Sequence, residues 1–282
     1  MLTPPPLHAD ALLAELHASV SAALGAQEVE RLQVARAVLG LFFTGVQLDN
    51  GIVGLCATPL KSIPQAVCCP SSAQAMPVPG KLIGRSAAEL LQDLYRSQAL
   101  RRTLAIATLN ALAETLWQRD GPPPDVRVQA GDAFDALAIA PGERVALVGA
   151  FPPYMRRLRQ AGQPFTVLEL DPATLKAEEL PYYRPAHQAA EVLAQCDALI
   201  TTGTTLVNDS LDGLLAHLRP GARAAVVGPS ATLLAAPFAR RGVRVVGGTR
   251  VLQPQGLLDL LAEGGSGYHF FDKVVQRVCL CW

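Results

Sequence analysis

The spacing of apolar residues along the chain changes several times and predicts different elements in different segments. In residues 7–24, apolar side chains recur every three or four positions, which predicts an amphipathic helix. From Glu28 to Phe43, β-branched and aromatic residues favour strands. Asp49-Asn50-Gly51 then predicts a tight turn between two further apolar runs. We therefore expect the chain to open with a helix and an antiparallel meander.

Proline and glycine mark the next boundaries. Residues 58–80 contain five prolines and show no period, which indicates a long loop. Ser86 and Glu89 form a capping box that predicts the start of a helix, and a second helix follows Arg102. That helix should end at the cluster Gly121-Pro122-Pro123-Pro124. We expect a small α+β N-terminal domain over residues 1–120 and a second domain over 121–282.

In the second domain, short runs of Val, Ile and Leu alternate with helical stretches. This alternation predicts a Rossmann-like, doubly wound α/β domain with a parallel sheet. The strands are expected at 144–148, 165–170, 198–201, 223–227 and 243–246, with helices near 153–161, 186–195, 209–218, 232–241 and 254–263.

Composition narrows the range of partners. The chain has 24 Lys and Arg against 24 Asp and Glu, so no basic field exists to attract nucleic acid or an anionic membrane. Hydrophobic residues make up 50%, which supports a sizeable core and a homo-oligomer. No apolar run approaches the roughly 18 residues of a membrane span. The N-terminus also lacks a signal-peptide pattern, so we expect a cytoplasmic protein.

In a doubly wound sheet, ligands bind beyond the carboxyl ends of the strands. The first expected strand ends in Gly149-Ala150-Phe151-Pro152, with a single glycine where a dinucleotide pyrophosphate needs several. NAD binding is therefore not expected. Pro152 suits the first turn of a helix, and Phe151 either fills a tight turn or forms a pocket wall.

Two further loops carry polar groups. Glu169 follows Gly149 by 20 residues and could accept hydrogen bonds from a ligand, or it could cap a helix. The segment Thr202-Gly203-Thr204-Thr205 precedes a helix whose cap would be Asn208 or Asp209. Hydroxyls and amides at a helix N-terminus predict a cradle for an anion, although plain turn chemistry gives the same pattern.

Four other places complete the expected site. Gly228-Pro229-Ser230 and Gly248 follow the last two expected strands, where missing side chains allow close backbone approach. From the first domain we expect Asp49 and Asn110 to face them. Asn110 lies in an Ala- and Leu-rich helix, so its amide should either face solvent or be paired at an interface.

The evidence for a metal ion bound directly by the protein is weaker. The six cysteines include no Cys-x-x-Cys, and the five histidines show no ligand spacing. Cys68-Cys69 or the pair Cys279 and Cys281 could supply soft ligands, although a structural role is the simpler interpretation. Without a secretory signal, the thiols are expected to be reduced.

The same loops resemble a known family, the heavy-metal chelation domain proteins, formerly a domain of unknown function. The resemblance covers nearly the whole chain. It implies a domain similar to the enolase N-terminal domain joined to a Rossmann-like domain, with a site between them. The matching motifs are Gly149-Ala150-Phe151-Pro152, Glu169, Thr201–Asn208, Gly228-Pro229-Ser230, Glu263-Gly264-Gly265, Gly84-Arg85-Ser86 with Glu89, and Leu109-Asn110-Ala111-Leu112.

Three hypotheses follow. In the first, the protein binds a transition or heavy metal ion, or a metal held by a small anionic chelator, in the interdomain cleft. In the second, it is an enzyme acting on a small anionic substrate in the same cleft, with Glu169 as acid or base. In the third, it is a scaffold without a tight ligand. No activated nucleophile is recognisable in the sequence, which disfavours the enzyme.

Overall fold

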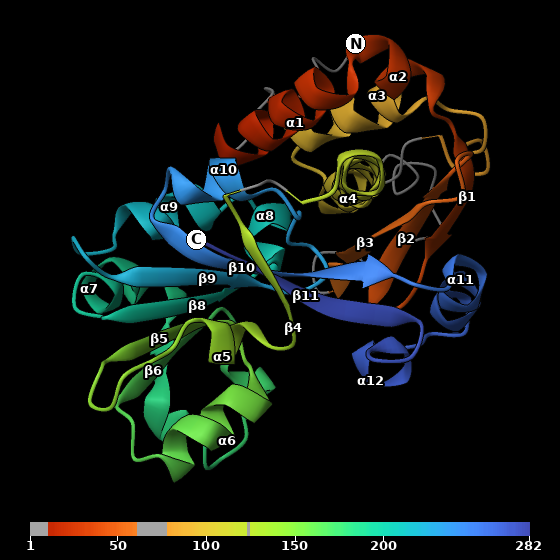
Figure 1. The fold of residues 1–282 in the computed structure, drawn as a ribbon. Helices are drawn as coiled ribbons and strands as arrows, with labels where there is room; N and C mark the ends of the chain where they lie inside the picture. Colours follow the sequence, from red (N-terminus) through yellow and green to blue (C-terminus); the bar gives the residue numbers. More distant parts are fainter. Residues whose placement is uncertain (1–10, 61–77, 123–124) are drawn as a thin grey trace, which may run out of the picture.

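The first part of the computed structural model is a three-stranded antiparallel sheet covered by helices (Figure 1). The structure describes residues 11–60, 78–122 and 125–282. The strand order is β1-β2-β3. The elements are α1 (Ala11–Leu24), α2 (Ala26–Arg31), β1 (Val34–Leu39), β2 (Phe43–Leu48), β3 (Val53–Ala57), α3 (Ala87–Leu91), the 3-10 helix η3 (Gln92–Tyr95) and α4 (Ala99–Asp120).

The opening helix and the meander are confirmed, with one correction. The stretch that follows Glu28 begins as helix α2 and becomes strand only at Val34. Gly25, with φ 91°, separates α1 from α2, and Glu28 pairs with Arg31 one turn later at 2.6 Å. An ion pair between residues three positions apart stabilises a helix, and the spacing of apolar residues does not reveal it.

The second part is built on an eight-stranded sheet of order β4-β11-β10-β9-β8-β5-β6-β7. Its strands are β4 (Arg127–Ala130), β5 (Val145–Val148), β6 (Phe165–Glu169), β7 (Tyr183–Pro185), β8 (Ala198–Thr202), β9 (Arg223–Val227), β10 (Val243–Val251) and β11 (Val275–Cys281). Its helices are α5 (Ala133–Ala136), α6 (Pro152–Gln160), α7 (Ala189–Leu193), α8 (Thr204–Val207), α9 (Leu211–Ala216), α10 (Ala235–Ala239), α11 (Pro254–Ala262) and α12 (Gly267–Phe270), with 3-10 turns η4 (Pro172–Thr174), η5 (Leu180–Tyr182) and η6 (Ala186–Gln188).

The α/β class is confirmed, but the sheet is mixed rather than wholly parallel. The six strands from β10 to β7 are parallel, whereas β11 is antiparallel to both β10 and β4. The sequence analysis did not expect β4, β7 or β11 among its strands. Two of these are short edge strands, and β11 carries Gln276 and Arg277, so none of them has the apolar signature of a buried parallel strand.

A continuous core joins the two parts. One apolar cluster runs from α1 and α4 to α9 and α10. A second lies under α5 and α6 on the opposite face of the large sheet. A third joins β3 to α11 and α12, through Leu55, Leu257 and Phe270. Helix α11 therefore packs on β1 and β2 as well as following β10, and Figure 1 shows it beside them.

Helix α11 ends as the glycine pair after Glu263 predicts. Gly264 has φ 77°, and the Gly265 amide donates to the Leu260 carbonyl at 2.7 Å, which closes the last turn. Across the described ranges 11–60, 78–122 and 125–282, no helix is both long and apolar enough to cross a membrane.

Replacing Gly54 by alanine should destabilise the fold by about 1–3 kcal/mol or more, because the added methyl overpacks β3 against α4. A Cβ at Gly54 would lie 2.0 Å from the Ala107 carbonyl oxygen. Gly213→Ala is the matched control, since a Cβ at this exposed position on α9 meets nothing within 4 Å. Urea unfolding should show the control unchanged or stabilised by about 0.5–1 kcal/mol. Equal stabilities of the two variants would contradict the packing described.

Candidate functional site

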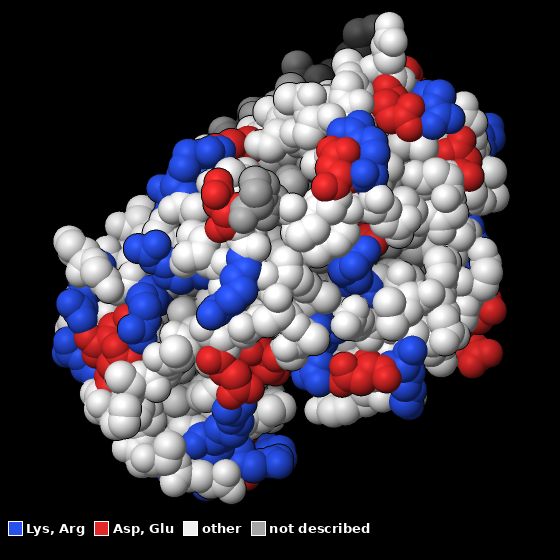
Figure 2. Space-filling view, viewed as in Figure 1, with Lys and Arg blue, Asp and Glu red and all other residues white. Residues whose placement is uncertain are grey.

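A cavity of about 830 Å³ opens where β5 and β9 end and beside the middle of β10. It corresponds to the hollow between the two lower lobes of the molecule in Figure 2. Both parts of the chain line it: the turn before β2 contributes two phenylalanines, and the remaining residues come from the second part. The lining residues are Phe42, Phe43, Gly131, Asp132, Ala133, Phe151, Pro153, Tyr154, Val227, Gly228, Pro229, Gly247, Gly248, Thr249, Ser266, Gly267, Tyr268, Phe271, Asp272 and Arg277.

One wall of the cavity is the start of α6. Phe151 precedes the helix and stacks on Tyr154, with ring centroids 5.1 Å apart and an interplanar angle of 18°. Pro152 occupies the first helical turn as expected, but its neighbour Pro153 is the proline that lines the cavity. Of the two interpretations of Phe151, the structure shows the pocket wall.

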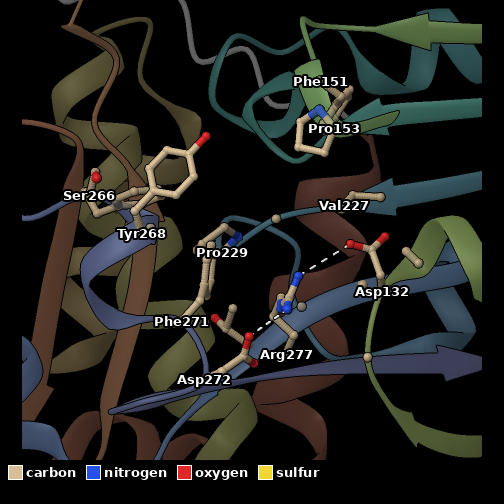
Figure 3. A pocket seen from close by; sticks show the side chains of 18 of the residues that line it. Asp132, Phe151, Pro153, Val227, Pro229, Ser266, Tyr268, Phe271, Asp272 and Arg277 are labelled. Carbon is tan, nitrogen blue, oxygen red and sulfur yellow. Dashed lines mark hydrogen bonds and ion pairs between the residues drawn. The ribbon is translucent and has the colours of Figure 1, made fainter. Parts of the chain in front are cut away.

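The opposite wall comes from α12 and the turn that follows it (Figure 3). Tyr268 is 87% exposed at the rim, and Phe271 lies deeper. A Cβ at Gly267 would lie 2.6 Å from the Phe271 ring, so only glycine allows this ring position. This wall is therefore aromatic, and the position of its Phe271 ring depends on the missing side chain at Gly267.

Glycines form the floor at the end of β9 and inside β10, which continues past the expected end at Val246, so that Gly248 lies within the strand and does not follow it. Gly228 has φ 120°, a conformation that favours glycine. Cβ atoms at Gly247 and Gly248 would lie 2.7 Å from Ala133 and 2.6 Å from Leu233, respectively. The absence of side chains thus lets α5 and the turn after β9 close over the strand ends and leaves room for a ligand above them.

A chain of polar side chains crosses the cavity. Asp132 caps α5 by accepting from the Phe134 amide at 2.9 Å, and the same oxygen accepts from the Tyr154 hydroxyl at 2.5 Å. Arg277 on β11 donates to Asp132 at 3.5 Å and to Asp272 at 2.6 Å, as the dashed lines in Figure 3 show. Arg277 also lies 5.8 Å from the centre of the Phe271 ring.

Tyr154 and Arg277 both keep their protons near neutral pH. Burial raises the pKa of Tyr154 strongly, and the hydrogen bond to Asp132 adds to the effect, so the phenol keeps its proton. The hydrogen bond to Asp272 raises the pKa of Arg277, which remains a cation. The cavity therefore presents one fixed positive charge between two carboxyl groups.

Asn110 and Ser230 join the two parts of the chain behind the cavity. The Asn110 amide donates to the Leu55 carbonyl at 2.7 Å and to the Pro229 carbonyl at 3.1 Å, and Thr232 donates to its oxygen at 2.6 Å. The buried Ser230 hydroxyl accepts from the Ala57 amide at 2.9 Å. Of the two alternatives for Asn110, the structure shows interface pairing.

Several expected site residues do not line the cavity. Glu169 accepts from the Ala150 amide at 3.2 Å and the Leu170 amide at 2.8 Å, so its carboxylate holds two loops together. Asp49 is exposed and bonded to the Gln33 amide at the far turn of the small sheet. These contacts are local, and the structure does not bring either carboxylate to the cavity.

The hydroxyls of the threonine loop, Thr202 to Thr205, are likewise hydrogen-bonded within the loop. The Thr202 hydroxyl accepts from Thr204, and the Thr205 hydroxyl donates to the Thr202 carbonyl at 2.6 Å. Asn208 accepts from Ser210 at 2.6 Å. A Cβ at Gly203 would lie 2.9 Å from the Ala231 amide, and one at Gly149 would lie 3.0 Å from Thr202. These two glycines therefore serve close packing between loops.

Of the residues selected from the sequence, Phe151, Gly228, Pro229 and Gly248 line the cavity. The analysis missed the polar chain of Asp132, Tyr154, Asp272 and Arg277 and the rim residue Tyr268. Asp132 had a readable signal, because Gly131-Asp132 before an apolar helical turn is typical of a helix cap. Arg277 had none, since its role depends on β11 adding to the sheet in the antiparallel sense.

The described residues do not fit a directly ligated metal ion. Within residues 11–60, 78–122 and 125–282, no three His, Cys, Asp or Glu side chains lie close enough to hold one. Cys279 and Cys281 share a strand face as expected, but burial raises the pKa of Cys279 to about 12. A metal bound there would have to displace the proton of a buried thiol, which disfavours the site. Cys68 and Cys69 lie outside the described residues.

Two family models cover most of the chain. Both carry the description "Putative heavy-metal chelation": DUF4213 matches residues 22–113, and DUF364 matches 132–279. The chain belongs to this heavy-metal chelation family. The resemblance of its motifs is thereby confirmed. Phe42 and Phe43 lie within the first match and nearly all other cavity residues within the second, so residues from both matched regions line the cavity.

Two solved structures of the family share the fold. A protein with unknown function from Pyrococcus horikoshii has a TM-score of 0.75 at 17% identity, over 96% of this chain and 100% of that chain. One from Desulfitobacterium hafniense has a TM-score of 0.70 at 19% identity, over 95% of this chain and 99% of that chain. No curated protein matches the chain.

Asn110→Ala should lower the free energy of unfolding by about 1–3 kcal/mol, because it leaves the buried partners of the amide without hydrogen bonds. Thermal and urea unfolding measure this loss. Asn208→Ala is the matched control, since the only described side-chain partner of Asn208 is the nearby Ser210, in an exposed setting. If the Asn110→Ala protein is as stable as the control, the hydrogen bonds of Asn110 do not hold the two parts of the chain together.

Proposed function

We propose that this protein binds a metal complex, in which a small organic chelator already holds the metal, and that the complex occupies the 830 Å³ cavity. The cavity lies between the two proposed domains, residues 1–120 and 121–282. The observation that carries the proposal is the lining itself, which offers aromatic walls and one fixed cation but no His or Cys. The family description supports a role in chelation.

A complex fits these residues better than a bare ion. An ion would need several carboxylate, imidazole or thiolate ligands directed at one point. The lining contains two carboxyl groups, and both pair with Arg277, while Asp132 is also committed to Tyr154 and the Phe134 amide. A chelator that supplies the donor atoms removes that requirement and leaves the protein to recognise the organic part.

The walls suit a flat organic group. Phe151 and Pro153 on one side face Tyr268 and Phe271 on the other (Figure 3). Aromatic contacts of this kind contribute about 0.5–1.5 kcal/mol each beyond simple burial. A cavity of this volume falls within the range of about 300–1,000 Å³ that small-molecule sites occupy.

Arg277 is the group that would bind an anionic substituent of the chelator. Its partner Asp272 has a side chain 61% exposed, so solvent weakens this ion pair and a ligand carboxylate can replace Asp272. Asp132 is less exposed and doubly anchored, so it would keep the guanidinium aimed into the cavity. The guanidinium then binds a planar anion in the bidentate manner that arginine favours.

The enzymatic alternative has less support. Its acid or base, Glu169, already accepts from the Ala150 and Leu170 amides and is not part of the lining. Tyr154 is a poor general base because burial raises its pKa and keeps the phenol protonated. Binding therefore accounts for the described residues more completely than catalysis does.

Titration calorimetry with two probes tests the proposal: Zn²⁺ alone, and the Zn²⁺ complex of 8-hydroxyquinoline-5-sulfonate, an aromatic anionic chelator. We expect the complex to bind at least about tenfold more tightly than the ion, a difference of about 1.4 kcal/mol. Tyr268→Ala should weaken binding of the complex by about 0.5–1.5 kcal/mol without changing the melting temperature, since Tyr268 is at the rim.

Leu170→Ala is the control, because Leu170 is also exposed and apolar, at 76%, but lies at the end of β6 outside the lining. It should bind the complex as the unaltered protein does. Tighter binding of Zn²⁺ alone, or no binding of the complex up to millimolar concentration, would contradict the proposal. A stoichiometric Zn²⁺ site that disappears in a Cys68→Ser, Cys69→Ser protein would point to direct ligation instead.

A further inference from the structure

A second pocket, of about 510 Å³, lies at the opposite end of the large sheet, where β9 and β10 begin and β11 ends. Its floor is apolar and its rim carries arginines. The lining residues are Asp125, Arg127, Ala136, Leu137, Arg223, Arg244, Val245, Cys281 and Trp282. None of these residues belongs to the cavity described above, so the two pockets have separate linings.

Strand register brings the arginines together. Arg127 opens β4 and pairs across the ladder with Cys281 at the end of β11, which in turn pairs with Val245 on β10. Arg223 opens β9, and the Trp282 amide donates to the Arg244 carbonyl at 3.4 Å. Because β11 runs antiparallel to both β4 and β10, its Cys281-Trp282 end lies between the starts of those two strands, which carry Arg127 and Arg244.

The charges at this pocket are not balanced. Three arginines face one aspartate, and neither Arg127 nor Arg244, both exposed, forms an ion pair within the described residues. This contrasts with Arg144 and Arg219, which precede β5 and β9 and share Asp197. In Figure 2, blue side chains lie around the place where Figure 1 marks the C-terminus. The surplus of positive charge is local, because the whole chain is neutral.

Two donors in the pocket are also unused. Arg223 donates to Glu143 at 2.6 Å through one terminal nitrogen, but its buried Nε has no partner among the described residues. The buried indole Nε1 of Trp282 likewise has none in the part of the chain that the structure describes. Buried donors without acceptors cost free energy, and because both atoms are closed to solvent, a ligand in the pocket meets them only if neighbouring side chains shift.

We propose that this pocket binds a small, multiply charged anion. Arg127 and Arg244 pair with the charge of the ligand, and the indole of Trp282 lies in the same lining. Arginine side chains match phosphate and carboxylate oxygens in a planar, bidentate geometry. Leu137 and Val245 in the floor leave room for an apolar group attached to the anion. The anion site is separate from the metal-complex cavity, and the proposal for it stands whether or not that cavity binds a ligand.

Tryptophan fluorescence tests this directly. The chain has two tryptophans, and Trp117→Phe retains a ring beneath Arg250, so emission from that variant reports Trp282 alone. The probes are sodium pyrophosphate and sodium citrate, with calorimetry on the same protein for stoichiometry. We expect a saturable change in Trp282 emission at a stoichiometry near one, weakened by added salt because exposed charges are screened. Response to one probe alone identifies whether phosphate or carboxylate oxygens are preferred.

The decisive variant is Arg127→Ala with Arg244→Ala, which should weaken binding at least about tenfold and leave the fold intact because both side chains are exposed. Arg156→Ala with Arg159→Ala is the matched control: it removes the same charge from exposed positions on α6 outside the pocket. It should bind as before. Absence of saturable binding of either probe by both readouts, or an equal loss in the two double variants, would overturn the proposal.

Discussion

Asn110 and Ser230 form the joint on which the candidate site depends. They tie the turn after β9 to β3 and α4 through hydrogen bonds from both sides, and each of these groups is buried or partly buried. Because the turn begins with Gly228 and Pro229, which form part of the cavity, its position sets the cavity's shape. The third core cluster reinforces this joint by packing α11 and α12 on the small sheet. Phe42 and Tyr268 reach the same cavity as a consequence.

Much of the fold could be predicted from local patterns. Helical spacing in residues 11–24, the Asp49-Asn50-Gly51 turn and the alternating strands and helices of the second part all depend on near neighbours in the chain. Strand β11 could not be predicted in this way. Its Arg277 is polar because it lines the cavity, whereas Gln276 points to the other face of the strand, and the place of both is decided by pairing with β10, which is distant in sequence.

Only part of the site could be predicted, because local patterns do not show contacts between distant segments. The rule that ligands bind at the carboxyl ends of strands selects Phe151, Gly228, Pro229 and Gly248, which line the cavity. The rule also selects Glu169 and the threonine loop, whose polar groups are already hydrogen-bonded to nearby backbone groups. Sequence shows that a polar group is available but not whether a neighbouring amide has already bound it. Asp132 meets the Asp272–Arg277 segment only after two parts of the chain 145 residues apart have folded together.

Metal recognition falls to a chelator because the cavity is aromatic and its lining contains no Cys or His. Anomalous X-ray diffraction at the zinc edge measures this most directly, on crystals grown with the Zn²⁺ complex of 8-hydroxyquinoline-5-sulfonate. The account predicts a zinc peak inside the cavity, between Phe151 and Tyr268, with all donor atoms coming from the chelator or water. A zinc peak bonded to protein sulfur, imidazole or carboxylate atoms, in the cavity or elsewhere, would contradict it.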